Sequence, residues 1–434
     1  MLLYFMVKNY RSIRDEAILD MEAAKLQDSM DVLLPYSKSA YLPAVAIYGK
    51  NGGGKSNLIR GMWLAVQFIR NAQKTQSENA SIPVSSFALN DYSCNMPTAF
   101  EFGYVQNDVK YVYGFSATRD HVVSEYLKAW PNGRESSIFL RTEQGFTFPN
   151  NSERKRKELI SEAVGKNQLF FAISCIMNYE PCIEAMRWFR EKILFSREYN
   201  DINRSLLDYS EDEAMLQAIV TAAKTADVGI EDMRFEINNQ EIDLDANIEN
   251  MPSQMRGIVK ALRVFSEALR LNGNEAEANL SAGELKSMTY HTGINQSGAH
   301  ERYELTLSDE SDGTRRLMTL APAIEKTLAN GGVLIVDELE REMHLTLMEY
   351  VLDRYQRKSS NTKNAQIIFT THGTALLNQE KLRRDQIYFV DKNRESGAST
   401  LYSLVDFSVR NDANIEKSYL LGKFGAVPSI EEVN

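Results

Sequence analysis

The sequence predicts an α/β fold in which a mixed sheet with flanking helices is interrupted by a long helical insertion. Three short apolar runs, at residues 45–48, 333–336 and 366–369, have the composition of strands buried on both faces. Each run is followed by glycine, acidic or hydroxyl residues, which are typical of the ligand-binding edge of an open sheet. A long stretch of chain separates the first run from the other two, so the flanks of the insertion must meet in space.

The first motif is a phosphate-binding loop. Residues 49–56 match the pattern G-x-x-x-x-G-K-[ST] and lie between a strand and a helix expected to run from Ser56 towards Ile69, which disfavours a chance match. The glycines let backbone N–H groups point inward as a cradle for phosphate, at the positive end of the helix dipole. We expect Lys55 to reach the β- and γ-phosphates of ATP and Ser56 to ligate Mg²⁺. The expected nucleotide-binding residues of this motif are Asn51, Gly52, Gly53, Gly54, Lys55, Ser56 and Asn57.

The second of the apolar strands ends in two acids. We expect Asp337, at the carboxyl end of the strand, to hold Mg²⁺ through water. Glu338 follows directly and is placed to polarise an attacking water as a general base. Acids after strands are common on protein surfaces, and the phosphate loop is what favours the catalytic interpretation.

Two further segments complete the expected site. Ser311 and Gly313 precede a helix expected over residues 314–328, where a serine and a glycine form an anion site. A simple helix N-cap is the alternative. His372 follows the strand at 366–369, and a neutral imidazole there can contact the γ-phosphate and hold the attacking water. A structural histidine is the alternative, so both assignments depend on their position relative to the acidic strand.

Composition excludes several classes of protein. A net charge of −10 argues against a protein that coats DNA along its whole surface. Three cysteines are too few for a disulfide framework or a zinc site and weakly suggest a reducing compartment. The N-terminus lacks the basic segment of a signal peptide, and there is no stretch of 18 apolar residues, so we expect a cytoplasmic chain without a membrane segment.

Local patterns divide the chain into three expected parts. An N-terminal ATPase lobe, with the phosphate loop and a β-hairpin at residues 99–105 and 110–115, covers residues 1–150. A helical arm covers 151–280, and a C-terminal ATPase lobe covers 281–434. Within the arm, the sequence predicts helices at 153–165, 182–194, 211–226 and 255–271, a strand at 233–237 and a loop at 238–250.

The order of these motifs resembles that of the ABC-type ATPases of the OLD/RloA/AbiL group, which are relatives of RecF and SMC heads. The stretches that carry the resemblance are residues 9–13, 49–57, 310–317, 333–344, 384–390 and 403–428. It is weakest across residues 150–280. The resemblance implies an ABC-type P-loop ATPase head in which ATP is sandwiched between two protomers, with Ser311 and Gly313 capping the γ-phosphate held by the other copy. Many such relatives act in prokaryotic defence against phage, often with a nuclease fused to them or encoded beside them.

The resemblance also bears on three further positions. The sequence 339–345 departs from the Ser-Leu-His-Pro that relatives often have after the two acids. A glutamine that contacts Mg²⁺ is not evident, and Gln168, before an apolar run, is the candidate. Arg11 resembles the N-terminal arginine that reaches nucleotide in SMC-like heads, and a surface arginine is the alternative.

These observations predict an ATP-hydrolysing subunit that forms a homodimer or higher oligomer through its ATP sites. It would act as a sensor or scaffold that controls a separate, nuclease-like effector, with a nucleic acid or a phage protein as trigger. One alternative is a DNA-maintenance ATPase of the RecF/SMC type, for which the basic run at residues 154–157 is the candidate contact. Another is an OLD-type nuclease, for which Asp391 is the nearest acid at a strand end after His372. An ABC transporter subunit is disfavoured because the arm interrupts the core.

Overall fold

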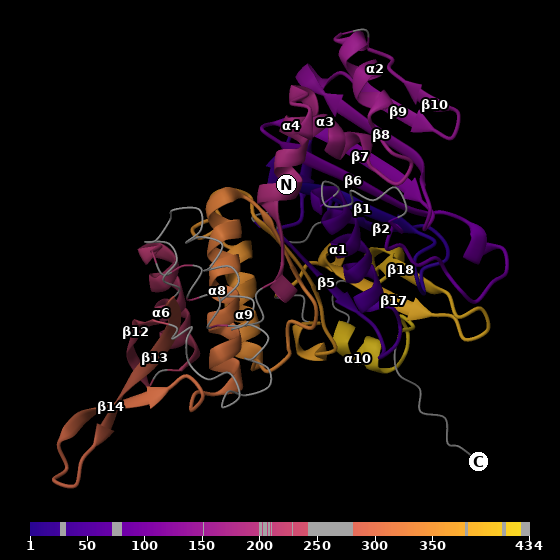
Figure 1. Cartoon of the computed structure of the whole chain (residues 1–434). Coiled ribbons are helices and arrows are strands. Elements are labelled where there is room, and N and C mark those ends of the chain that lie inside the picture. The colour runs from indigo at the N-terminus through magenta and orange to yellow at the C-terminus, as the bar shows by residue number, and fades with distance from the viewer. Residues whose placement is uncertain are drawn as a thin grey trace, which may run out of the picture. The chain divides into compact units, whose positions relative to one another are not determined.

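Figure 1 shows the computed structural model of the chain, which forms two compact units. The first unit combines Met1–Asn200 with Leu320–Asn434, and the second is Asp201–Thr319. Each unit is described by itself. The residues that the structure describes are 1–26, 32–71, 80–150, 152–198, 202, 206, 209, 211–227, 229–241, 281–377, 381–409 and 414–426.

The first unit contains a six-stranded sheet built from both ends of the chain. Its strand order is β11-β15-β16-β5-β17-β18; the first five strands are parallel, and β18 is antiparallel to β17. Because β5 pairs with β16 and β17, the two flanks of the insertion meet as expected. The bounds are β5 Ala44–Tyr48, β11 Ile193–Phe195, β15 Val333–Val336, β16 Gln366–Thr370, β17 Ile387–Lys392 and β18 Ser399–Ser403.

A seven-stranded antiparallel sheet forms the other layer of this unit, in the order β10-β9-β8-β7-β6-β1-β2. The expected hairpin is confirmed: Gln106 pairs with Val109, and the two turn residues Asn107 and Asp108 both have positive φ, as a tight hairpin turn requires. The bounds are β1 Leu2–Lys8, β2 Ala17–Asp20, β6 Thr98–Gln106, β7 Val109–Ala117, β8 Val122–Trp130, β9 Ser136–Thr142 and β10 Gly145–Thr147.

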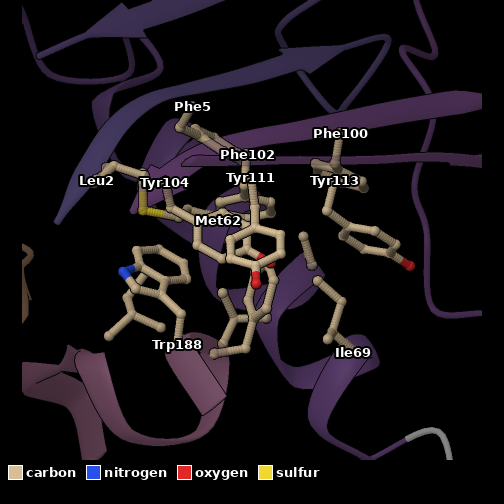
Figure 2. Packing of buried hydrophobic residues seen from close by; sticks show 14 of the residues in the cluster. Leu2, Phe5, Met62, Ile69, Phe100, Phe102, Tyr104, Tyr111, Tyr113 and Trp188 are labelled. Carbon is tan, nitrogen blue, oxygen red and sulfur yellow. The ribbon is translucent and has the colours of Figure 1, made fainter. Parts of the chain in front are cut away.

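The helix α1 (Lys55–Asn71) packs its apolar face against the antiparallel sheet (Figure 2). Met62 and Ile69 of α1 lie under the aromatic rings of β6 and β7, and Trp188 closes the same cluster. The rings of Tyr104 and Trp188 stack with centroids 4.7 Å apart. Burial of such aromatic side chains contributes roughly 1.5–3 kcal/mol each and fixes the start of α1, which carries Lys55, relative to both sheets.

Residues 152–198 belong to this core, so the boundary expected at residue 151 differs from the one in the structure. Trp188 and Phe189 are fully buried, and the Arg70 guanidinium of α1 donates a hydrogen bond to the Phe189 carbonyl oxygen (2.6 Å). The helix expected over residues 182–194 is shorter in the structure. Its last expected residues, from Ile193, belong instead to the strand β11, which pairs with β15. An exposed arm could not bury these aromatic side chains. The elements are α2 Arg154–Glu162, α3 Phe170–Ile176, α4 Glu180–Arg187 and the π-helical turn η4 Trp188–Lys192.

The described part of the second unit contains the helix α6 and a three-stranded antiparallel sheet, where the sequence analysis expected a mainly helical arm with one strand at residues 233–237. The helix expected over residues 211–226 is present as α6, and the Asp212 carboxylate caps it by accepting from the Met215 N–H (3.1 Å). The strand order is β12-β13-β14, and β12 extends into the segment expected to be a loop. The helix expected at 255–271 lies outside the described residues. The bounds are α6 Glu213–Ala226, β12 Ile230–Glu241, β13 Ser281–Ile294 and β14 His300–Thr306.

The remaining elements complete the two units. The helix α8 begins in the second unit and continues into the first, where Gly331, with a φ of +69°, follows its end. No helix among the described residues is both long enough and apolar enough to span a membrane. The remaining bounds are α8 Asp312–Asn330, α9 Leu345–Gln356, α10 Ile415–Leu420, β3 Leu34–Tyr36, β4 Ser39–Tyr41 and the 3₁₀ turns Ser93–Asn95, Pro131–Gly133, Ser196–Glu198, Thr374–Leu376, Arg384–Gln386 and Leu404–Asp406.

Candidate nucleotide-binding site

The phosphate loop connects β5 to α1 through backbone with positive φ, which favours glycine. Gly49, Gly52 and Gly54 have φ values of +154°, +73° and +116°. A Cβ atom on Gly49 would lie 2.3 Å from the carbonyl oxygen of Val390 in β17, and one on Gly54 would lie 2.4 Å from the Ser399 hydroxyl. The loop is therefore held tightly between β5, β17 and β18, with its N–H groups at the start of α1.

Lys55 is buried under this loop. Its side chain is 4% exposed, and Nζ donates a hydrogen bond to the Gly49 carbonyl oxygen (2.6 Å). The same Nζ lies 3.0 Å from His372 Nε2. Burial lowers the pKa of Lys55 to about 8, and Glu340, Asp337 and Glu338 oppose this shift in that order. Burial thus penalises the charged form of the ammonium group, and the three nearby carboxylates favour it.

The acidic strand end meets the start of α1. Asp337 Oδ1 accepts hydrogen bonds from the Ser56 hydroxyl (3.2 Å) and the Thr370 hydroxyl (2.7 Å). β15 and β16 are adjacent parallel strands, so Asp337 and Thr370 both lie at the carboxyl edge of the sheet. The sequence analysis missed Thr370, although its place at the end of a neighbouring strand was a usable signal.

Glu338 has a strained backbone at the point where the base was expected. Its φ is +55°, which is uncommon for a residue with a side chain and costs about 1–3 kcal/mol. The Glu338 N–H donates to the Thr370 hydroxyl (2.7 Å), a bond that helps to hold this conformation. The Glu338 side chain lines a cavity of about 520 Å³. The cavity is lined by Gly49, Asn51, Glu338, Glu340, Arg341, His372, Thr374, Tyr419 and Leu420.

His372 follows β16 and faces the same cavity. Partial burial lowers its pKa below the ordinary 6.5, and the positive charge of Lys55 lowers it further. Glu340, Glu338 and Asp337 oppose these two effects. The imidazole is therefore neutral at pH 7, which is the form that can contact a phosphate oxygen and a water molecule together.

The N-terminal segment contacts the end of the phosphate loop and β18. The Ser12 hydroxyl accepts a hydrogen bond from the Asn57 amide (2.8 Å), and the Ser12 carbonyl accepts one from the Ser399 N–H (2.7 Å). The Ser399 hydroxyl in turn donates to the Gly53 carbonyl oxygen (2.7 Å). Arg11, which is exposed with a φ of +49°, is therefore next in sequence to a residue that contacts the phosphate loop. Sequence reasoning missed Ser399, and the nucleotide contact expected of Arg11 stays a prediction.

The contacts of Gln168 give it a structural role. Its side-chain oxygen accepts a hydrogen bond from the Gly165 N–H (2.9 Å), and its carbonyl accepts one from Arg141 of β9 (2.6 Å). These bonds close the turn between α2 and α3 beside the antiparallel sheet. They lend no support to Gln168 as a Mg²⁺ ligand.

The expected signature residues lie in the second unit. Ser311 precedes α8 and its hydroxyl accepts a hydrogen bond from the Thr314 N–H (3.1 Å), so it is a helix N-cap; Gly313 lies in the first turn. The preceding residue, Glu310, is buried, accepts from the Thr289 hydroxyl and lies 2.9 Å from His291 Nε2. Glu310 thus ties the start of α8 to β13, a contact that the sequence analysis did not anticipate.

Comparison with known proteins assigns the chain to a family. Residues 44–378 match the family described as "AAA domain, putative AbiEii toxin, Type IV TA system". The match covers more than half of the chain, and the chain therefore belongs to this family of P-loop ATPases. A search of curated proteins found no match.

Solved structures with a similar fold include two SMC heads and a RecF protein. An SMC head bound to the C-winged helix domain of ScpA is 13% identical to this chain, with a TM-score of 0.40. The match covers 93% of this chain and 97% of the SMC head. The SMC head domain from Thermotoga maritima is 12% identical to this chain, with a TM-score of 0.38. The match covers 93% of this chain and 98% of the SMC head domain. The recombination mediator protein RecF with ATP is 13% identical to this chain, with a TM-score of 0.30. The match covers 92% of this chain and 97% of the RecF chain.

Proposed function

We propose that this chain binds ATP with Mg²⁺ at residues 49–57 and hydrolyses it. The observation that carries the proposal is the contact of Ser56 with Asp337, beside the contact of Lys55 with His372. These four side chains come from α1 and from the ends of β15 and β16, and they converge on one edge of the sheet. A buried cation, two oxygen ligands for a metal ion and a side chain able to position water, all beside a phosphate loop, are parts that phosphoryl transfer uses.

The residues present fit a hard divalent cation. The Ser56 hydroxyl and the Asp337 carboxylate supply the oxygen ligands that Mg²⁺ prefers, and they are already within hydrogen-bond distance of each other. A bound Mg²⁺ would neutralise charge on the phosphate oxygens. Lys55 would exchange its bond to the Gly49 carbonyl for one to a phosphate oxygen. Glu338 would accept the proton of the attacking water, and His372 would hold that water.

We propose that the site is completed by a second copy of the chain, through Ser311 and Gly313. Support comes from the start of α8, where the first-turn N–H groups of a 19-residue helix form an anion site. ATP would then bridge two copies only in the closed state and so favour that state.

We further propose an association with the OLD/RloA/AbiL group and a role in anti-phage defence through a separate, nuclease-like effector. Support comes from the sequence resemblance and from the family description, which names a toxin system. The second unit, which carries the signature residues, is the proposed surface for a trigger or an effector.

Contacts of the described residues bear on one specific expectation of each alternative, and an ATPase of the RecF/SMC type stays compatible with the family match. In the basic run expected to bind DNA, Arg154 pairs with Glu158 (2.9 Å), Arg156 pairs with Glu153 (3.0 Å) and Lys157 is buried, so neighbouring carboxylates offset part of the positive charge of this run. Asp391, the acid considered for a nuclease site, pairs with Lys50 of the phosphate loop (2.9 Å). Among the described residues, no group of three or more His, Cys, Asp or Glu is arranged to hold a metal ion.

The proposal is tested by measuring ATP binding and phosphate release with the purified chain, with Mg²⁺ and with EDTA. We expect Mg²⁺-dependent release of phosphate. Failure to bind ATP would contradict the proposal, whereas binding without hydrolysis would contradict its catalytic part alone.

A further inference from the structure

A third carboxylate, Glu340, lies in the catalytic cavity beside Glu338 and His372. One of its oxygens, Oε1, accepts a hydrogen bond from the backbone N–H of His372. The other, Oε2, is buried and has no hydrogen-bond partner in the protein. An unpartnered buried carboxylate oxygen is costly, so its persistence beside a phosphate site calls for a functional reason.

The position of Glu340 is set by the backbone. Leu339, the residue before it, is fully buried, and its N–H donates to the Thr370 carbonyl oxygen (3.0 Å). The next N–H, that of Arg341, donates to the Glu338 carbonyl oxygen (3.1 Å). The segment therefore turns around the end of β16, and Glu340 meets His372 because of this turn.

The loop at residues 371–374, which we name the histidine loop, is held on its other side by the C-terminal helix. The Thr374 hydroxyl donates to Glu416 Oε1 of α10 (2.7 Å). Within the loop, the Gly373 N–H donates to the Thr371 hydroxyl (3.0 Å). Two carboxylates thus restrain the histidine loop, and Glu340 is the one bound to His372 itself.

We propose that Glu340 is a positioning residue of this site, which holds the backbone of His372 so that the imidazole stays against Lys55, and which sets a negative charge opposite the terminal phosphate. The inference builds on the proposed ATPase function. A hydrogen bond from an N–H to a carboxylate is about twice as strong as one between neutral groups, so it can fix the loop. The negative charge of Glu340 balances the positive charge of Lys55 before nucleotide binds, and it repels the γ-phosphate once ATP is bound.

Two variants separate these effects. Glu340→Ala removes both the acceptor and the charge, whereas Glu340→Gln keeps an acceptor and removes only the charge. In the nucleotide-free protein we expect hydrogen exchange of the His372 amide to be slow in the wild type and in Glu340→Gln, and fast in Glu340→Ala. The chain has five histidines, so selective ¹⁵N-histidine labelling gives a simple spectrum, assigned with His372→Gln.

Kinetics supply the second readout. We expect Glu340→Ala to lower kcat by about tenfold, because the variant loses one charge-assisted hydrogen bond. Glu340→Gln should lower kcat less and bind ATP more tightly, because the repulsion is gone. This split between kcat and affinity distinguishes positioning from a general loss of structure, which would lower both.

Two matched carboxylate variants serve as controls. Glu416→Gln alters the histidine loop at Thr374 and should leave the His372 amide protected. Glu349→Gln removes a carboxylate of α9 that pairs with Lys381 (3.4 Å) and should leave the ATPase rate unchanged. Wild-type exchange and wild-type kcat in Glu340→Ala would overturn the proposal, and unchanged ATP affinity in Glu340→Gln would overturn its electrostatic part. Because amide exchange needs no nucleotide, it tests Glu340 even if the protein proves to hydrolyse no ATP.

Discussion

The Ser56 hydroxyl lies 3.2 Å from Asp337 Oδ1, although one residue opens the first long helix and the other ends a strand in the C-terminal part of the chain. The parallel pairing of β15, β16 and β5 brings them together, because all three strands end at the same edge of the sheet. Thr370, at the end of β16, donates to the same carboxylate oxygen (2.7 Å) and fixes its orientation. The oxygen ligands expected for Mg²⁺ are thus preorganised in the protein alone.

Glu338→Gln should slow hydrolysis by about 10²–10⁴-fold, the usual contribution of a positioned base, and leave ATP affinity nearly unchanged. Phosphate release and equilibrium ATP binding measure the two effects. Hydrolysis at the wild-type rate would show that another group accepts the proton.

Lys55→Ala should weaken ATP binding instead, by about tenfold or more, because it removes a charged contact to the phosphates. Equilibrium titration with a fluorescent ATP analogue measures this, with Glu349→Gln as the control. An unchanged Kd would mean that the backbone of the loop dominates binding.

Ser311→Arg and Lys55→Ala proteins should each be inactive, and mixing them should restore part of the ATPase activity. In a mixed pair, one interface joins an intact phosphate loop to an intact signature segment. The measurement is phosphate release against mixing ratio, with subunit exchange followed by an affinity tag. If exchange occurs and no activity returns, the site is complete within one chain.

The imidazole of His372 should titrate below pH 6.5, because partial burial and then Lys55 lower its pKa. The folded protein therefore binds this proton less readily than the unfolded chain, so the associated stability is present above pH 6.5 and is lost as the pH falls. Lys55→Met removes the nearby positive charge and should raise the pKa of His372, as measured by NMR titration of labelled histidine. A pKa that is unchanged or falls in this variant would contradict the Lys55–His372 contact.

Thr327→Val should destabilise the first unit by about 1–3 kcal/mol, because it leaves the buried Tyr355 hydroxyl without its partner (2.6 Å). Tyr355→Phe should cost less, since the Thr327 hydroxyl still donates to the Ala323 carbonyl oxygen (2.9 Å). Urea unfolding of both variants and of the double variant measures the coupling. Additive effects would show that the two hydroxyls do not depend on each other.

Local sequence was sufficient where the chemistry depends on neighbouring residues. The phosphate loop, the acidic strand end and the hairpin at Asn107 and Asp108 were all predictable, because glycine spacing, apolar runs and turn residues act over a few positions. The insertion between the two flanks of the sheet also followed from spacing alone.

Contacts between distant segments were decided by the tertiary structure. Periodicity predicted a helix over residues 182–194. In the structure α4 ends at Arg187, Trp188 and Phe189 are buried, and Ile193 begins β11, because the chain there pairs with β15. The spacing of residues along the sequence could not show that Ser399 would contact the phosphate loop or that Glu340 would bind the His372 backbone. Each of these contacts forms only because strands from distant parts of the chain pair in one sheet. The sequence by itself determined which chemical groups the site has, and the pairing of distant strands in one parallel sheet decided which of them touch, because a contact across the fold depends on backbone geometry that no single segment contains.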